Sequence, residues 1–574
     1  VGLNQAAQAF SWEAPRYLKS DGECVLLVPA MGLFEEPSAA FRKNFFSCYQ
    51  VQVVANFANL AEVLFDGRAR VPAAALNFSR RSEETEFDGD ERILVYSPFV
   101  VNQEATCPSE SGKRGKIWSL SVNAGEISIL EQREVATGSG LPWKIAMWGS
   151  AWDERLLKRL EAKWPVLESL EAKWDRKKHE FVATDEFHVI GVSEGLQLRL
   201  KPEDSDEASN PAPIEQASCA KTLDKNETNR LRHVFAFPET ATPRLSEGPW
   251  YGRGGRAPLP LAVCKPPHIV VSAARTFAVY SDEFVIVPAR QIGIVSCSQD
   301  RDFLKALSLF LSSDFAFYHQ FFRSTELGVK RDRATLESLR KMPIPLLNLS
   351  QEKLSEWVEL HGKLAKCKPR KLDAGGSKKK QDQTEMFDPV DTDLDELLLH
   401  LNELTADALG LTKAERPLIH DLVQVRYALN DGKRGDAAMR APEKKELRQY
   451  ARALKEELDG FVGDEADRRH KVSVLADGKS AMMEIDFTDD KKSARKPVVL
   501  SAVDASADTL RKTRDLLLDE SNATQWAYFN RNLRIFRGRK VYVFKPLNRF
   551  HWTQSSALND AGQIIAETLS GVHV

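Results

Sequence analysis

A chain of 574 residues is too long for a single hydrophobic core, and its length predicts about three to four domains. Its 80 Lys and Arg residues are balanced by 82 Asp and Glu residues, so a general polycation is excluded and any nucleic-acid binding must come from local basic patches. No apolar stretch is long enough to span a membrane and no signal-peptide pattern opens the sequence, so we expect a cytoplasmic protein without a membrane partner. Seven scattered cysteines without C-x2-C spacing predict reduced thiols and no metal site.

The first segment, residues 1–85, is predicted to be the end of an α/β domain. A helix over 5–18 precedes Glu23–Pro29, a continuous apolar run typical of a strand buried on both faces. A second helix over 38–47 and strands at 51–54 and 72–78 follow. This order is typical of the back half of a doubly wound sheet. Because the sequence opens at Val1 inside a predicted helix, we expect it to be part of a longer sequence.

The second predicted domain spans residues 86–350. A helix over 152–170 is expected to break at Pro165, and the polar residues 201–228 predict an exposed loop. Short β-branched and aromatic strands follow, and one long apolar helix over 302–322 closes the region. The predicted strands are 268–271, 276–280 and 284–287.

Two further parts complete the predicted organisation. Residues 351–465 are expected to be a helical spacer that contains a flexible basic linker at 366–393. Residues 466–574 alternate strands with two helices, around 504–518 and 555–569, and predict a small α/β module.

Several strings in the first part of the chain carry a family resemblance. They are Gln5–Phe10, Leu18–Pro29, Phe41-Arg42 and Phe57–Phe65 followed by Val71–Phe78. In this order they resemble N6-adenine DNA methyltransferases just downstream of the catalytic loop. The group is the large one with methylase and target recognition fused in one chain, which includes type IIG restriction-modification enzymes and phage-defence methylases. Further on, the string from Leu339 to Pro345, after Leu304–Ser313 and Gly328, resembles the closing signature of its target-recognition domain.

This resemblance implies a fold class and a chemistry. The fold would be multidomain α/β and α+β: the rear part of a doubly wound, Rossmann-like methyltransferase sheet, a mixed α/β target-recognition domain, a helical segment and a small α/β module. The chemistry would be methyl transfer from S-adenosyl-L-methionine to an adenine swung out of double-stranded DNA. It needs an Asn-Pro-Pro-aromatic loop and a Gly-containing donor-binding turn.

Neither element is found in the sequence. The one Pro-Pro pair lies between Lys265 and His268, which cannot serve as amide acceptor and aromatic platform. The glycine-rich string at 252–255 follows no strand and opens no helix. We therefore expect no methyl transfer by this chain alone. The resemblance gives Phe65 the position of an aromatic residue that stacks on the flipped adenine, with packing in the core as the alternative.

Candidate DNA contacts fall in two loops of the second domain. An Arg- and aromatic-rich, Gly-containing loop around Trp250 suits groove and phosphate contacts, and a basic turn beside Gly328 suits phosphates. For any one of these residues the alternative is a solvated loop. The candidates are Arg244, Tyr251, Arg253, Arg256, Lys330, Arg331 and Arg333.

A third candidate is the segment 526–552, which interleaves basic and aromatic residues and predicts a nucleic-acid-facing hairpin. Strand alternation would place Tyr542 and Phe544 on one face and Val541 and Val543 on the other. The alternative is an ordinary hairpin with a buried aromatic face and surface Arg. Its candidate contacts are Arg534, Arg537, Arg539 and Lys545. A nuclease site at the nearby acids is rejected, because Glu484, Asp486, Asp489 and Asp490 lie in one short stretch.

Two functional hypotheses remain, and a weaker third. The first is a methyltransferase part that supplies target recognition and a section of the catalytic fold, with the missing N-terminal part or a separate catalytic subunit as partner. The second is a non-catalytic DNA-binding specificity subunit of a restriction or phage-defence complex. The third is an inactive scaffold. An in-frame Asn-Pro-Pro-aromatic loop upstream of Val1 would separate the first from the second.

Overall fold

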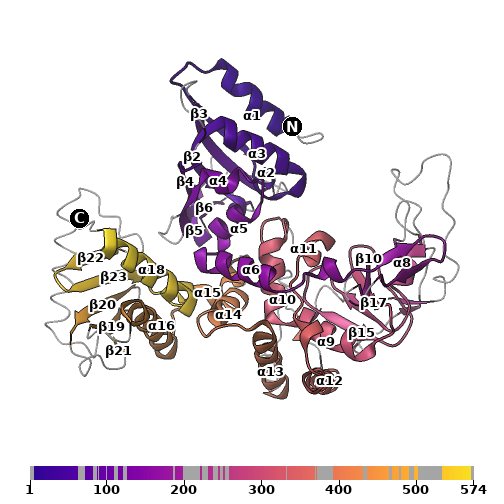
Figure 1. Ribbon diagram of the computed structural model, residues 1–574. Coiled ribbons are helices and arrows are strands. Elements are labelled where there is room, and N and C mark those ends of the chain that lie inside the picture. Colours follow the sequence, from indigo (N-terminus) through magenta and orange to yellow (C-terminus); the bar gives the residue numbers. More distant parts are fainter. Residues whose placement is uncertain are drawn as a thin grey trace. The chain divides into compact units, whose positions relative to one another are not determined.

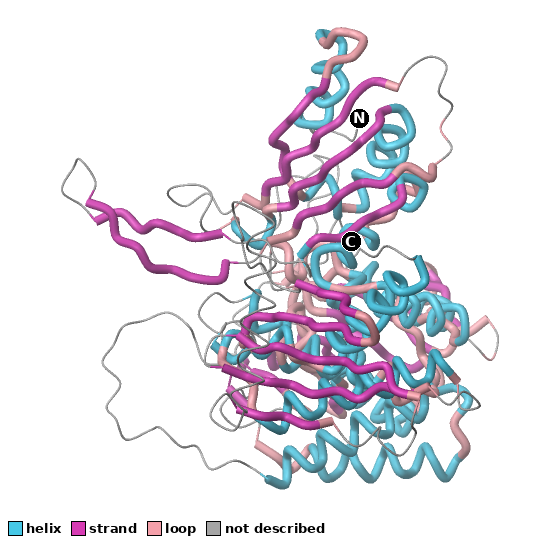
Figure 2. The backbone as a smooth tube through the Cα atoms, turned by 90° about the vertical axis from the view of Figure 1, so that its left-hand side faces the viewer, coloured by secondary structure: helices cyan, strands magenta, loops and turns pink. Residues whose placement is uncertain are grey.

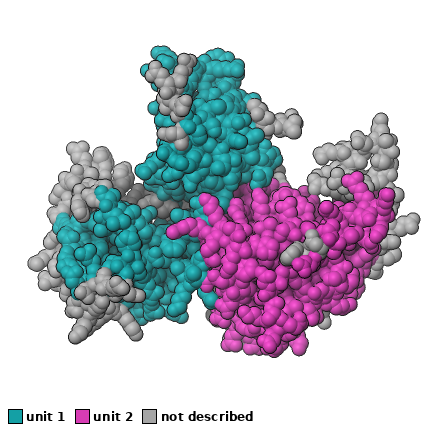
Figure 3. Space-filling view, viewed as in Figure 1, with its two compact units in different colours: residues 1–154, 412–574 teal, residues 155–411 magenta. Residues whose placement is uncertain are grey.

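The computed structural model describes residues 6–570 apart from a set of short stretches and three long ones. The stretches outside the description are 62–70, 82–86, 88, 99, 109–113, 121–125, 185, 187, 198–219, 223–230, 237–243, 246–249, 252–257, 331–332, 369, 372–391, 431–435, 464–467, 478–479, 490–496 and 502–532. The chain forms two compact units (Figure 3), residues 1–154 with 412–574, and residues 155–411. Among the described residues, none of the helices has the length and apolar character needed to cross a bilayer.

The N-terminal part is built on a five-stranded mixed sheet (Figure 1). β3 is antiparallel to both β1 and β2, so β1 and β2 run in the same direction, and α3 (Ala39–Cys48) lies in the connection between them. β4 continues parallel to β2, and β7 is reversed. The spatial order is β1 (Glu23–Pro29), β3 (Ala73–Arg80), β2 (Tyr49–Asn56), β4 (Arg92–Tyr96) and β7 (Ile127–Glu131).

Aromatic rings pack the helices onto one face of this sheet. Phe45 of α3 is fully buried and its ring meets Phe78 of β3 with centroids 4.9 Å apart. Trp12 of α1 (Ala6–Glu13) contacts Phe41 and Phe45 edge-on. The predicted helices and strands of this part are therefore confirmed, and their apolar residues face a common core.

A buried arginine fixes the start of α3. Arg42 is fully buried and its guanidinium donates to the carbonyls of Gly138 (2.6 and 2.9 Å), Gly32 (2.9 Å) and Glu35 (2.8 Å). Burial lowers its pKa to about 10. Gly138 has φ +85° and a Cβ there would lie 2.7 Å from the carbonyl oxygen of Ala39, so only glycine fits this contact.

One detail of the predicted sheet is wrong, and a second is not confirmed. β1 is not buried on both faces, because the side chains of Val25 and Leu27 are 64% and 62% exposed. The doubly wound arrangement is not confirmed, because the described helices of this part pack on one face of the sheet (Figure 2). β1 is apolar on both sides although the described helices cover only one of them. A local sequence pattern does not distinguish such a strand from one that is buried on both faces.

The second unit contains the antiparallel sheet β10-β17-β14-β15. Its strands are β10 (Ile190–Glu194), β17 (Ile292–Ser296), β14 (His268–Val271) and β15 (Ala278–Ser281). A second small sheet holds β13 (Arg244–Leu245), β11 (Lys221–Thr222) and β16 (Val285–Ile286). The three strands predicted between 268 and 287 are thus confirmed. Around them lie α6 (Ala151–Lys163), α12 (Gln351–Leu364) and α13 (Thr392–Leu409).

The long helix predicted over 302–322 is wrong in one respect, because it is two helices. α9 (Arg301–Ser312) ends at Ser313, and α10 (Asp314–Arg323) begins there. Ser313 has extended backbone angles and its hydroxyl accepts from the amide of Ala316 at 3.2 Å, as an N-cap does. Apolar residues continue on both sides of the cap, so the periodicity alone did not reveal the break.

The C-terminal module is a second five-stranded sheet with helices on one face. Its order is β21 (Val498–Ser501), β19 (Arg469–Asp477), β20 (Ser480–Thr488), β23 (Lys540–Pro546) and β22 (Leu533–Arg537). α16 (Lys444–Val462) and α18 (Gln554–Ser570) pack against it, and α18 confirms the predicted second helix. Val541 and Val543 lie on the face opposite Tyr542 and Phe544, as predicted, and it is the valine face that is buried, so the alternative of a buried aromatic face is wrong. The predicted helix around 504–518 lies outside the described residues.

Candidate functional site

The face of the N-terminal sheet that no described helix covers, here named the open face, carries an apolar patch beside a polar row of Glu23, Ser79, Arg92 and Glu131. The register places ten side chains on it in two rows that cross all five strands. Asn77 is the one side-chain amide among these ten. The first row is Val25, Asn77, Val53, Leu94 and Ile129, and the second is Leu27, Ala75, Ala55, Tyr96 and Ile127.

Exposure on the open face is greatest at its two ends. Val25 and Leu27 on β1 and Ile129 on β7 are all more than 60% exposed, although they are large aliphatic residues. Isolated exposed apolar residues are ordinary, but a contiguous apolar patch across a sheet marks an interaction surface. The small Ala55 and Ala75 at its centre leave room for a close-packed element.

The strand at one border of this sheet adds a second feature. In the described sheet β1 pairs only with β3, so its other edge presents backbone N–H and C=O groups that no strand pairs. Unprotected edge strands are templates for further strand pairing. Among the described strands, β1 therefore ends the sheet with an unpaired edge next to an exposed apolar patch.

The catalytic candidates of the sequence are not brought together in the described residues. Phe65 and the glycine-rich string 252–255 lie outside them. His268, after the Pro-Pro pair, is fully buried at the start of β14, and its Nδ1 lies 2.8 Å from the carbonyl oxygen of Val263. This corner packs the core and does not fit an adenine amino group. Among the described residues there is also no group of three or more His, Cys, Asp or Glu placed to hold a metal.

The loop around Trp250 is described only in part. Trp250 is buried in a cluster with Val285 and Ile286, so it packs the second unit. Tyr251 forms a two-way backbone bridge with Gln197, at 2.8 and 2.9 Å. Arg244 lies on β13, with its side chain outside the description, as are Arg253 and Arg256. As DNA contacts these four residues stay predictions.

The basic turn near Gly328 has one exposed and one paired cation. Lys330 is exposed, whereas the guanidinium Nε of Arg333 donates to Glu326 at 2.5 Å, and this hydrogen bond raises the pKa of Arg333. Gly328 has φ +72° and a Cβ there would meet the Phe321 ring at 2.4 Å. Arg331 lies outside the described residues. The turn is therefore held tightly, with Lys330 as its solvent-facing charge.

The basic residues of the predicted C-terminal hairpin differ in what they contact. Arg534 faces α18, where it donates to Glu567 at 2.7 and 3.0 Å. Arg539 in the hairpin turn pairs with Asp489 at 2.6 Å, and both are exposed. Arg537 is exposed on β22. Of the four candidates Arg537 and Arg539 lie at the surface of the module, and their contact with DNA stays a prediction.

The fourth candidate, Lys545, lies inside the protein. Its side chain is 2% exposed, and its ammonium contacts the carboxylate of Asp560, the hydroxyl of Tyr450 (3.0 Å) and the carbonyl of His551 (3.2 Å). The Nζ atom also lies 5.5 Å from the ring centroid of Trp552. Burial lowers the pKa of Lys545 and raises that of Tyr450. In this position Lys545 stabilises the module and offers no charge to an external ligand.

Two of the acidic residues that were rejected as a nuclease site form ion pairs with a lysine of the neighbouring strand. Glu484 and Asp486 lie on one face of β20, and Lys540 of the neighbouring β23 reaches them at 2.8 and 3.8 Å. These contacts are cross-strand ion pairs on the surface of a sheet.

A buried histidine in the second unit makes its stability depend on pH. His361 of α12 is 7% exposed, and burial followed by the charge of Lys305 lowers its pKa to about 4. An unfolded histidine titrates near 6.5. The unfolded state therefore binds the extra proton between these values, and stability falls as the pH drops from about 6.5 to about 4. Between pH 7 and pH 4.5, the free energy of unfolding should fall by roughly 2–3 kcal/mol more in the wild-type protein than in His361→Phe. Urea unfolding at the two pH values measures this difference. An equal pH slope in both proteins would contradict this.

Sequence reasoning missed one basic element. Arg176, Lys177 and Lys178 are exposed at the tip of a two-stranded hairpin, β8 (Lys173–Asp175) and β9 (Glu180–Val182). A signal was present, since the six residues between Trp174 and Phe181 are all charged or polar, which is typical of a hairpin turn.

Comparison with known proteins gives little beyond these residues. No protein-family model matches the chain, and no curated protein matches it. One solved structure to which it is similar is described as "Characterization and crystal structure of the type IIG restriction endonuclease BpuSI", at 12% sequence identity and a TM-score of 0.24. The match covers 70% of this chain and 49% of that chain, so this chain spans about half the length of that protein. A TM-score this low does not show a common fold.

Proposed function

We propose that this chain supplies DNA target recognition and one section of the catalytic sheet of a site-specific adenine DNA methyltransferase in a restriction-modification or phage-defence system. The observation that carries the proposal is the apolar open face of the N-terminal sheet together with the unpaired edge of β1 among the described strands. These are the borders at which the rear part of a larger α/β sheet would join its front part.

The resemblance of residues 1–80 to adenine methyltransferases gives that sheet a chemistry. The donor-binding turn and the Asn-Pro-Pro-aromatic loop would then come from the polypeptide that completes the sheet, and S-adenosyl-L-methionine would be held there. The described residues of this chain offer no acceptor loop of that kind, since the Pro-Pro corner before His268 is buried packing. The role of this chain is thus to complete the sheet and to hold the DNA.

DNA binding by the chain is the first expected result. We expect it to bind duplex DNA with an affinity that falls steeply with salt, with a slope of log K against log salt of about −3 or steeper, because each neutralised phosphate contributes about −0.9. Fluorescence anisotropy with a labelled duplex at 50 to 300 mM salt measures this slope. No binding to duplex DNA, or binding whose affinity does not change with salt, would contradict the proposal.

A genomic experiment separates the proposal from a purely DNA-binding subunit. Methylated adenines would be mapped in the host with and without the gene, and with the gene carrying substitutions on the open face. We expect a specific set of methylated sites to vanish in both altered strains. Unchanged methylation beside intact DNA binding would favour the non-catalytic specificity subunit.

A further inference from the structure

The basic hairpin β8–β9 is a preformed element of the second unit. Its strands pair in register from Lys173 with Val182 to Asp175 with Glu180. The carboxylate of Asp175 accepts from the amides of Lys177 (2.7 Å) and Lys178 (3.1 Å), and these hydrogen bonds lower its pKa. The turn closes where the amide of His179 donates to the carbonyl of Asp175 at 2.9 Å. The tip thus has a defined conformation.

The hairpin is also anchored to the sheet behind it. The rings of Trp174 and Phe181 meet edge-on at 5.0 Å across the two strands. Phe181 lies over Gly191 of β10, where a Cβ would come within 2.2 Å of the ring. Ahead of β8, Glu171 forms a two-point ion pair with Arg340, at 2.8 and 2.9 Å. These contacts fix the base of the hairpin and so the direction in which its tip projects.

The charge of this hairpin is concentrated at its exposed end. Between Lys173 and Val182 there are four Lys or Arg residues against two acids, a net charge of +2 in a chain whose overall charge is −2. One of the acids, Asp175, is turned to the backbone amides, and the other, Glu180, lies 3.9 Å from Lys178. Arg176, Lys177 and Lys178 are therefore presented together to solvent.

We propose that the tip of the β8–β9 hairpin enters a groove of duplex DNA, with Lys177 and Lys178 on phosphates and Arg176 at a base edge. This rests on the proposed function and adds to it the element that grips the target. The major groove is about 12 Å wide and accepts a two-stranded ribbon, and arginine can pair bidentately with guanine there. Single-stranded nucleic acid fits less well, because binding it depends on exposed stacking rings, and the two rings of this hairpin pack on each other.

The test removes the two lysines and compares the result with a matched control. K177Q/K178Q should flatten the slope of log K against log salt by about 1.8 and weaken duplex binding on the order of tens of fold at 0.1 M salt. K353Q/K363Q removes the same charge from exposed positions of α12 and should leave the slope unchanged. Both variants should keep the wild-type unfolding midpoint, because the replaced side chains are exposed.

Arg176→Lys tests base reading separately. Selection from a randomised duplex library should show a preference at one base position relaxed by roughly 5- to 100-fold, with the salt slope kept. An equal slope for K177Q/K178Q and the control, with wild-type DNA binding intact, would overturn the hairpin alone. Binding confined to single strands would also overturn it. If the wild-type chain binds no duplex, both this inference and the proposed function fail.

Discussion

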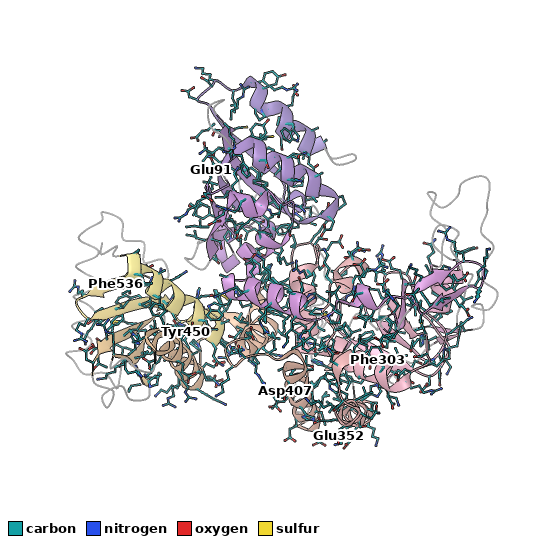
Figure 4. All side chains as sticks on the ribbon, viewed as in Figure 1. Glu91, Phe303, Glu352, Asp407, Tyr450 and Phe536 are labelled. Carbon is teal, nitrogen blue, oxygen red and sulfur yellow. The ribbon has the colours of Figure 1, made fainter. Side chains whose placement is uncertain are left out.

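Asp560→Ala is expected to lower the free energy of unfolding of the C-terminal module by about 3–5 kcal/mol, the cost of leaving a buried charge without its partner. Asp560 is 3% exposed and its carboxylate contacts both the ammonium of Lys545 and the hydroxyl of Tyr450. Tyr450 lies in the core between the helices and the sheet (Figure 4). Without Asp560, Lys545 keeps only the Tyr450 hydroxyl and one carbonyl, neither of which carries a charge.

Urea unfolding followed by tryptophan fluorescence measures this, since Trp552 is buried 4.9 Å from the Tyr450 ring. Replacing both charges, Lys545→Met with Asp560→Leu, should cost far less than Asp560→Ala, because no unpaired charge remains. Arg539→Ala breaks an exposed ion pair of the same module and should leave the midpoint unchanged. A wild-type midpoint for Asp560→Ala would show that the ammonium is stabilised by other means.

Lys545 also shows where prediction from sequence ends. The alternation of β23 correctly placed Val541 and Val543 together on one face, which the structure shows to be the buried one, and the same alternation places Lys545 there too. A lysine in a basic segment nevertheless suggests a surface contact. What makes its burial favourable is a carboxylate 15 residues downstream on another element, and no local pattern contains that information. Arg534 and its partner Glu567 on α18 are a second case.

Local elements were predictable where periodicity and turn residues act alone. β1, β2, β3 and α3 lie at the predicted residues, because their spacing follows from packing on one core. The cap at Ser313 was not recognised, since a polar residue in an apolar helix also fits an unbroken one. Which face of the sheet is covered was also beyond a local pattern, because the exposure of Val25 depends on elements far away in the sequence.

The second large effect is expected on the open face. Val25→Thr with Leu27→Thr should leave the chain itself folded, because both side chains are more than 60% exposed, and should lower its binding of a hydrophobic dye. Assembly with the polypeptide that completes the sheet should weaken by about 2–4 kcal/mol, or roughly 30- to 700-fold. This follows from burying the exposed two thirds of a Val and a Leu, each worth about 1.5–3 kcal/mol when fully buried.

Val498→Thr with Leu399→Thr is the matched control, since these residues are 43% and 61% exposed and belong to β21 and α13, which are not part of the N-terminal sheet. Mixing the chain with the part that holds the methyl-donor site and following methylation of duplex DNA against concentration would give the two affinities. If the open-face variant restores methylation at the same concentration as the control, the open face is not the surface that contacts the second polypeptide. The free edge of β1 would then have to hold the two parts together through backbone hydrogen bonds, which the two threonines leave intact.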